Sequence, residues 1–139
     1  MTAENNPLID LSAAMVAAVE KAAAATVTVD ARRRMPASGV AYAADLVLTA
    51  EHVVERDDDI HIGLPDGSSL AAVVAGRDPG SDLALLRLEK PAAAIAQQSA
   101  QSARVGQLVL MEIGEHFRRQ RGAVRRQSRA ARQTAARDP

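Results

Sequence analysis

A hairpin pattern over residues 59–78 is the feature that most constrains how this chain can fold. The sequence DIHIGLPDGSSLAAVVAGRD places Ile60, Ile62 and Leu64 on one face of an extended segment. A Pro-Asp-Gly turn follows, and the chain then returns through a segment rich in valine. A tight-turn sequence between two extended apolar runs predicts an antiparallel β-hairpin.

Further runs have the length and the composition of short strands. Each is bounded by residues that favour turns, and several short strands in succession indicate an antiparallel barrel or sandwich. These predicted strands cover residues 26–34, two segments within 38–50 that meet near Ala44 and Asp45, residues 81–88, and a last strand over 104–114.

The segment before the first predicted strand has the spacing of a helix. Between residues 8 and 24, apolar side chains recur at intervals of three and four, and the alanines favour helix further. The chain is therefore predicted to contain a helical segment over 1–24, a β domain over 25–114 and a tail over 115–139. The tail has little apolar periodicity, so it is predicted to be disordered or at most helical.

The net charge of zero conceals two oppositely charged parts. Residues 1–111 hold 9 Lys and Arg against 14 Asp and Glu, whereas residues 112–139 hold 8 Arg against 3 acids. So sharp a change of sign indicates two segments with different physical roles.

Composition limits what the β domain can build and where it can work. One Tyr, one Phe and no Trp leave the core without the side chains that bury the most area. The absence of Cys excludes disulfides and thiolate metal sites.

The N-terminus carries no basic region, and Glu20 and Lys21 interrupt the apolar stretch that follows. No signal peptide or membrane span is visible, so the chain as written is predicted to be cytoplasmic.

A histidine in an apolar run is the first candidate for chemistry. His52 lies in LVLTAEHVVE, residues 46–55, where a predicted strand breaks into a short helical turn. Nucleophilic catalysis needs a base of this kind, a group that orients it, and a nucleophile. Asp82 is the best-placed orienting acid, because it directly precedes the strand segment LALLRL and can face a histidine at the end of another strand.

These residues carry a resemblance to the HtrA/Deg-type trypsin-like serine proteases. In that family, a Leu-Thr-x-x-His-Val-Val box carries the catalytic histidine, and an Asp-Leu-Ala-Leu-Leu box carries the catalytic aspartate after an intervening hairpin. The corresponding residues here are 48–54, with His52, and 82–86, with Asp82. The resemblance spans residues 38–88, with an extension to VGQLVL.

The resemblance implies an all-β fold, the first antiparallel barrel of a double-barrel protease. It also implies hydrolysis of peptide bonds in protein or peptide substrates through an acyl-enzyme, without a cofactor or a metal. His52 would be the general base and Asp82 its orienting acid.

The family's nucleophile has no counterpart in this sequence. The family carries its serine in a Gly-Asn-Ser-Gly-Gly box of the second barrel, but no serine here has a Gly-x-Ser-Gly context. Ser128 lies among arginines and is not favoured as a nucleophile. The arginine-rich tail is typical of frameshifted or truncated coding sequence, so we expect the isolated chain to be inactive. A cleft face left uncovered would then associate with itself or with a partner that supplies the second barrel.

Each candidate also has a simpler interpretation. His52 could be a partly buried structural histidine, and Asp82 a turn carboxylate similar to Asp78. The acids at 57–59 beside His61 suggest a metal site, but a solvated turn is favoured because no ligand spacing closes around an ion.

Two alternatives to catalysis stay open for the whole chain. One is a non-catalytic β-barrel binding module or a pseudo-protease subunit. The other is a basic arm formed by the tail, although nucleic-acid binding is disfavoured because aromatic residues that would stack on bases are missing.

Overall fold

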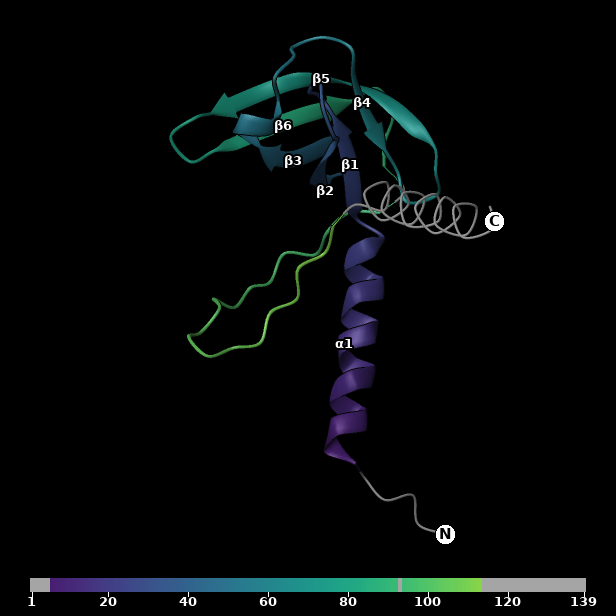
Figure 1. Ribbon diagram of the computed structural model, residues 1–139, viewed down its shortest axis with the longest axis vertical. Coiled ribbons are helices and arrows are strands. Elements are labelled where there is room, and N and C mark those ends of the chain that lie inside the picture. Colours follow the sequence, from purple (N-terminus) through teal and green to yellow (C-terminus); the bar gives the residue numbers. More distant parts are fainter. Residues whose placement is uncertain (1–5, 93, 114–139) are drawn as a thin grey trace, which may run out of the picture.

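The computed structural model describes residues 6–92 and 94–113, and within them a helix precedes a set of short strands (Figure 1). The tail predicted over 115–139, including Ser128, lies outside the described residues. The elements are α1 (Pro7–Ala23), β1 (Thr26–Asp30), β2 (Ala37–Ala43), β3 (Leu46–Ala50), a single 3₁₀ turn η1 (Glu51–Val53), β4 (Ile60–Gly63), β5 (Ser69–Asp78) and β6 (Leu83–Leu88).

The six strands form one closed antiparallel barrel, as the sequence predicted. The order around the barrel is β1-β2-β3-β6-β5-β4, and β1 closes it by pairing with β2 on one side and β4 on the other. The predicted hairpin is β4 and β5, in which Ile60 lies opposite Ala72 and Ile62 opposite Leu70. β3 ends at Ala50 and β6 begins at Leu83, with 32 residues between them in the sequence. The two strands are nevertheless neighbours in the barrel, and Ala50 and Leu83 are register partners.

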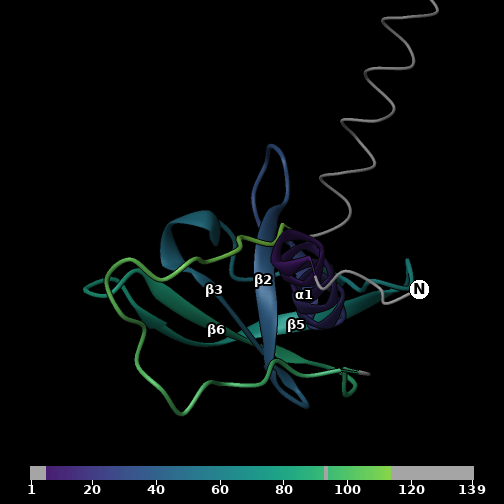
Figure 2. The same ribbon diagram turned by 90° about the horizontal axis from the view of Figure 1, so that it is seen from below.

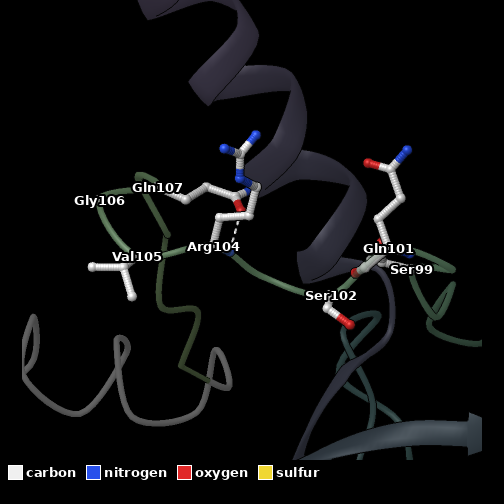
Figure 3. A pocket seen from close by; sticks show the side chains of 7 residues that line it. All are labelled: Ser99, Gln101, Ser102, Arg104, Val105, Gly106 and Gln107. Carbon is white, nitrogen blue, oxygen red and sulfur yellow. Dashed lines mark hydrogen bonds between the residues drawn. The ribbon is translucent and has the colours of Figure 1, made fainter.

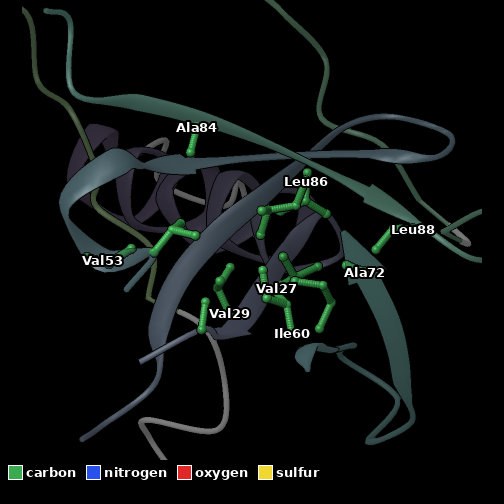
Figure 4. Packing of buried hydrophobic residues seen from close by; sticks show 12 residues of the cluster. Val27, Val29, Val53, Ile60, Ala72, Ala84, Leu86 and Leu88 are labelled. Carbon is green, nitrogen blue, oxygen red and sulfur yellow. The ribbon is translucent and has the colours of Figure 1, made fainter. Parts of the chain in front are cut away.

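The barrel interior is filled by aliphatic side chains. Strand positions that alternate inward supply it, and Ile60, Ile62, Leu86, Val27, Val29 and Val47 are the largest side chains that are fully buried. Figure 4 shows this packing. Tyr42 points outward and is half exposed, so the core contains no aromatic ring among the described residues. Its stability therefore depends on close aliphatic packing.

The prediction of a last strand over residues 104–114 is wrong for the residues described. Residues 104–113 form no strand, and several of their apolar side chains, such as Val105 and Met111, are exposed. The reason is that a closed barrel has no unpaired edge to which another strand could add. The strand predicted over 26–34 also ends earlier, at Asp30, and the arginines that follow lie in a bend.

The predicted N-terminal helix is α1, which extends away from the barrel in Figure 1 and is seen nearly end-on in Figure 2. Its first turn is stabilised locally, because the Asn6 side chain accepts a hydrogen bond from the Leu8 amide at 3.1 Å and Pro7 occupies the first helical position. No residue of α1 is buried, and Leu8 and Val16 are more than half exposed. No helix of the described residues is long and apolar enough to cross a membrane.

Replacing Gly39 by alanine tests how tightly the barrel is packed. A Cβ at this position in β2 would lie 2.8 Å from Cγ2 of Val29 and 2.9 Å from Cγ1 of Val47, both completely buried. We expect Gly39→Ala to lower the free energy of unfolding in urea by about 1–3 kcal/mol, because the core must shift.

The matched control is Gly76→Ala, also in a strand, where an added Cβ meets no atom within 4 Å. It should change the free energy of unfolding by less than about 0.5 kcal/mol. Equal losses in both variants would contradict the packing described.

Candidate active site

His52 sits in η1, the turn that follows β3 at one rim of the barrel. The turn forms here because Val53 and Val54, directly after the histidine, are buried in the core. Ala50, the residue before the turn, makes no side-chain hydrogen bond that caps it. The first N–H groups of the turn are bound instead by Asp82, whose backbone carbonyl accepts from Glu51 at 3.1 Å.

Asp82 lies at the same rim, immediately before β6. It has a positive φ of 56°, a conformation that aspartate tolerates better than most side chains. The preceding turn is held by Asp78, which accepts hydrogen bonds from the Gly80 amide at 3.1 Å and the Ser81 hydroxyl at 2.6 Å. Asp78 therefore holds this turn, while the Asp82 side chain faces His52 and also caps η1 by accepting from the His52 amide.

The two candidate residues are in direct contact. Nδ1 of His52 lies 2.7 Å from Oδ2 of Asp82, and the His52 backbone amide donates to Oδ1 at 2.9 Å. One carboxylate thus binds both the ring and the backbone of the same residue. With Nδ1–H donating to Asp82, the imidazole presents Nε2 as its proton acceptor, which is the tautomer that a general base requires.

The hydrogen bonds from His52 also change the acidity of Asp82. The pKa of its carboxyl lies below the ordinary value of 3.8, chiefly because the His52 amide and then the His52 ring donate to the charged form. Asp82 is therefore ionised over the range in which an imidazole changes its protonation, as an orienting acid must be.

The pair is open to solvent. The side chains of His52 and Asp82 are 67% and 51% exposed, so their geometry is not maintained by burial. Water and salt weaken the attraction between such groups. Among the described residues, none hydrogen-bonds to Nε2 of His52. The site therefore contains an imidazole held by a carboxylate, which are the two residue types that the predicted base and its orienting acid require.

The acidic loop that suggested a metal serves other contacts. Asp57 binds Arg77 at 2.7 Å, and Asp59 lies 3.7 Å from Nδ1 of His61. Within residues 6–92 and 94–113, no group of three or more His, Asp or Glu side chains is arranged to hold an ion.

Sequence reasoning did not identify Arg77, which contacts the turn that carries His52. From β5 its guanidinium reaches Glu51 at 3.0 Å and the Val54 carbonyl at 2.9 Å. These partners are more than 20 residues away along the chain, so no local spacing in the sequence marks the contact. The signals available in the sequence were Glu51, which is an acid next to His52, and Arg77, which is the one basic residue of β5.

Neither of two hollows found in the described part of the chain is lined by the candidate pair. One, of about 430 Å³, is formed by the connector after β6 and includes Ser99, Arg104 and Gln107 (Figure 3). The other, of about 460 Å³, lies between the end of α1, β1, β2 and the connector. The first is lined only by exposed residues of one connector, and no catalytic or metal-binding group lines it.

Known proteins resemble this chain in sequence. A family described as "Trypsin-like peptidase domain" matches residues 37–137. The periplasmic serine endoprotease DegP of Escherichia coli K12 is 37% identical over 84 residues, which cover 58% of this chain and 18% of that protein. A probable periplasmic serine endoprotease, DegP-like, of Ectopseudomonas mendocina is 42% identical over 82 residues, which cover 58% of this chain and 17% of that protein.

The chain spans less than a fifth of the length of these curated relatives. Among solved structures, a serine endoprotease from Yersinia pestis is 32% identical, with a TM-score of 0.49, and the alignment covers 56% of this chain and 29% of that one.

Substituting Asp82 by asparagine tests the bonds to His52 through pH. The pKa of Asp82 is lowered in the folded state, so protonation of its carboxyl favours unfolding. The stabilising effect of the ionised carboxylate is therefore present above pH 3.8 and is lost as the pH falls through the lowered pKa. We expect Asp82→Asn to unfold more easily than the wild type at neutral pH, and the gap to close in acid. Urea unfolding across the pH range measures this gap.

Asp58→Asn is the charge control, since it removes one carboxylate from the exposed loop at 57–59. A gap between wild type and Asp82→Asn that stays constant with pH would show that the Asp82 carboxylate is not bonded in solution.

Proposed function

Because the chain belongs to the trypsin-like peptidase domain family and is related to the HtrA/DegP serine endoproteases, we propose that it supplies the His/Asp half of a serine endopeptidase site. The observation that carries this proposal is the contact of 2.7 Å between Nδ1 of His52 and Oδ2 of Asp82. The substrates would be proteins or peptides cleaved at internal bonds.

In this reaction, His52 acts twice at Nε2. It takes the proton of the attacking hydroxyl as general base, and it then gives that proton to the leaving amine as general acid. Between these steps the imidazole is positively charged, and the Asp82 carboxylate stabilises it without taking its proton. The second bond of Asp82, to the His52 amide, fixes the carboxylate relative to the backbone that carries the ring.

The nucleophile and the oxyanion donors must come from outside the described residues. No serine in the 139 residues lies in a Gly-x-Ser-Gly sequence. We propose a second barrel as the source of both; self-association of this chain would cover the open face without supplying a nucleophile. The exposure of Leu83, at 43% and directly after Asp82, supports this.

A second candidate function is a barrel used only for binding. The observation that favours it is the exposure of the His52–Asp82 pair, since catalytic electrostatics are strongest where water is excluded. A binding module would need neither the base nor its orienting acid, and substitutions at both residues would leave its binding unchanged.

The isolated chain should be inactive. Incubated with casein and a serine-reactive fluorophosphonate probe, it should neither cleave the substrate nor become labelled, because loss of the serine alone costs about a millionfold in turnover. The control is His52→Ala. Labelling of the wild type that disappears in this variant would contradict the expected inactivity.

A chimera tests the proposed roles directly. Residues 26–88 would replace the matching segment of E. coli DegP, so that the relative supplies the rest of its protease domain. We expect the chimera to cleave casein, with kcat reduced on the order of 10⁶ by His52→Ala and on the order of 10⁴ by Asp82→Asn. A loss of kcat of this size is larger than a change in packing causes, so it would indicate that the residue takes part in the reaction.

His61→Ala is the matched control in the chimera, because His61 is the other exposed histidine of the barrel. It should keep the activity of the parent chimera. A His52→Ala chimera as active as its parent would remove the proposed role of His52 and favour the binding module.

A further inference from the structure

We infer that Arg77 is a positioning residue for His52, holding η1 so that the imidazole stays against Asp82; this rests on the proposed roles of the pair. Arg77 lies in β5 and touches neither the imidazole nor the Asp82 carboxylate in any described contact. Its effect on the site would be exerted through the turn alone.

The contacts of Arg77 bracket the histidine along the chain. One guanidinium nitrogen, Nη1, donates to Oε1 of Glu51 at 3.0 Å and to the Val54 carbonyl at 2.9 Å. The other, Nη2, donates to Oδ1 of Asp57 at 2.7 Å. The residue before His52 and the second residue after it are thus tied to the same side chain.

Asp82 and Arg77 hold opposite ends of the turn. Asp82 binds the N–H groups of Glu51 and His52, whereas Arg77 binds the carbonyl of Val54, where the turn ends. The two holding residues are five apart in one hairpin: Arg77 lies in β5, where it is the register partner of Ala84, and Asp82 lies in the connecting turn directly before β6. The β5–β6 hairpin therefore fixes the turn from both ends as one unit.

The contact of Arg77 with Glu51 is better protected from water than the contact of His52 with Asp82. The side chains of Arg77 and Glu51 are each 25% exposed, compared with 67% for His52. A hydrogen bond to Asp57 raises the pKa of Arg77 above its ordinary value, with a smaller contribution from Glu51. A guanidinium can serve three acceptors at once in a fixed plane, which a lysine ammonium does less well.

Other contacts keep η1 folded when Arg77 is removed, so a substitution should displace the turn without unfolding it. Val53 and Val54 remain buried, and the amides of Glu55 and Arg56 donate to the Ala31 carbonyl at 2.9 and 3.1 Å. The expected consequence is a longer or more variable hydrogen bond between the His52 amide and Asp82.

The test follows the His52 backbone amide by NMR in the full chain. Because this amide donates to Oδ1 of Asp82, its chemical shift changes as Asp82 ionises, and the size of the change reports the hydrogen bond. We expect Arg77→Met to reduce the size of this change and to move its midpoint up towards 3.8. High salt in all samples screens the direct effect of the lost charge.

Three variants make the result specific. Arg77→Lys keeps the charge and should behave more like the wild type than Arg77→Met does, and it also provides a folded variant if the methionine variant does not fold. Arg87→Met removes an exposed arginine of β6 whose Nε lies 3.9 Å from Oδ2 of Asp45, and it should leave the His52 amide unchanged. Asp57→Asn removes the charge of the most exposed partner of Arg77 and should change the His52 amide less than Arg77→Met does.

The outcomes separate this inference from the proposed function. If the His52 amide responds to pH in Arg77→Met as it does in the wild type, or changes equally in Arg87→Met, then Arg77 has no positioning role. Neither result would contradict the contact between His52 and Asp82. If the wild-type amide does not follow an ionisation that Asp82→Asn abolishes, the pair is absent in solution, and both the inference and the proposed function fail.

Discussion

Closure of the sheet is the constraint on which the rest of this structure depends. β1 pairs with β2 and with β4, so every strand of the barrel has two neighbours and the aliphatic core is enclosed on all sides. Closure also places β3 beside β6, although a long stretch of chain with two other strands separates them. The end of one and the start of the other meet at the same rim, and the candidate site is built there.

At that rim, hydrogen bonds to backbone amides fix the positions of the side chains, as burial does in an enclosed active site. His52 and Asp82 are both more than half exposed, and an isolated ion pair between such groups contributes little and has no fixed geometry. Here the Asp82 carbonyl and carboxylate bind consecutive amides of η1, so the carboxylate is aligned with the ring before any charge develops. An arrangement prepared in this way can serve as one half of a site whose cover comes from a partner.

Much of the fold followed from local sequence patterns. The alternating segments and the Pro-Asp-Gly turn predicted the β4–β5 hairpin, and the spacing of apolar residues predicted α1. The strand over residues 104–114 was predicted by the same reasoning and does not form in the residues described, because a strand needs an edge as well as a suitable composition. Whether an edge exists depends on how the other strands pair.

The sequence by itself determined which residue types the site would contain: a histidine after one strand, an aspartate before another, and no serine in a nucleophile context. Only the tertiary structure decided that Asp78 stabilises the turn while Asp82 faces His52, since both acids lie in the same short segment. It also decided that Arg77 binds the turn from β5. The physical reason is that these choices depend on distances across paired strands, which are set by closure of the barrel and not by spacing along the chain.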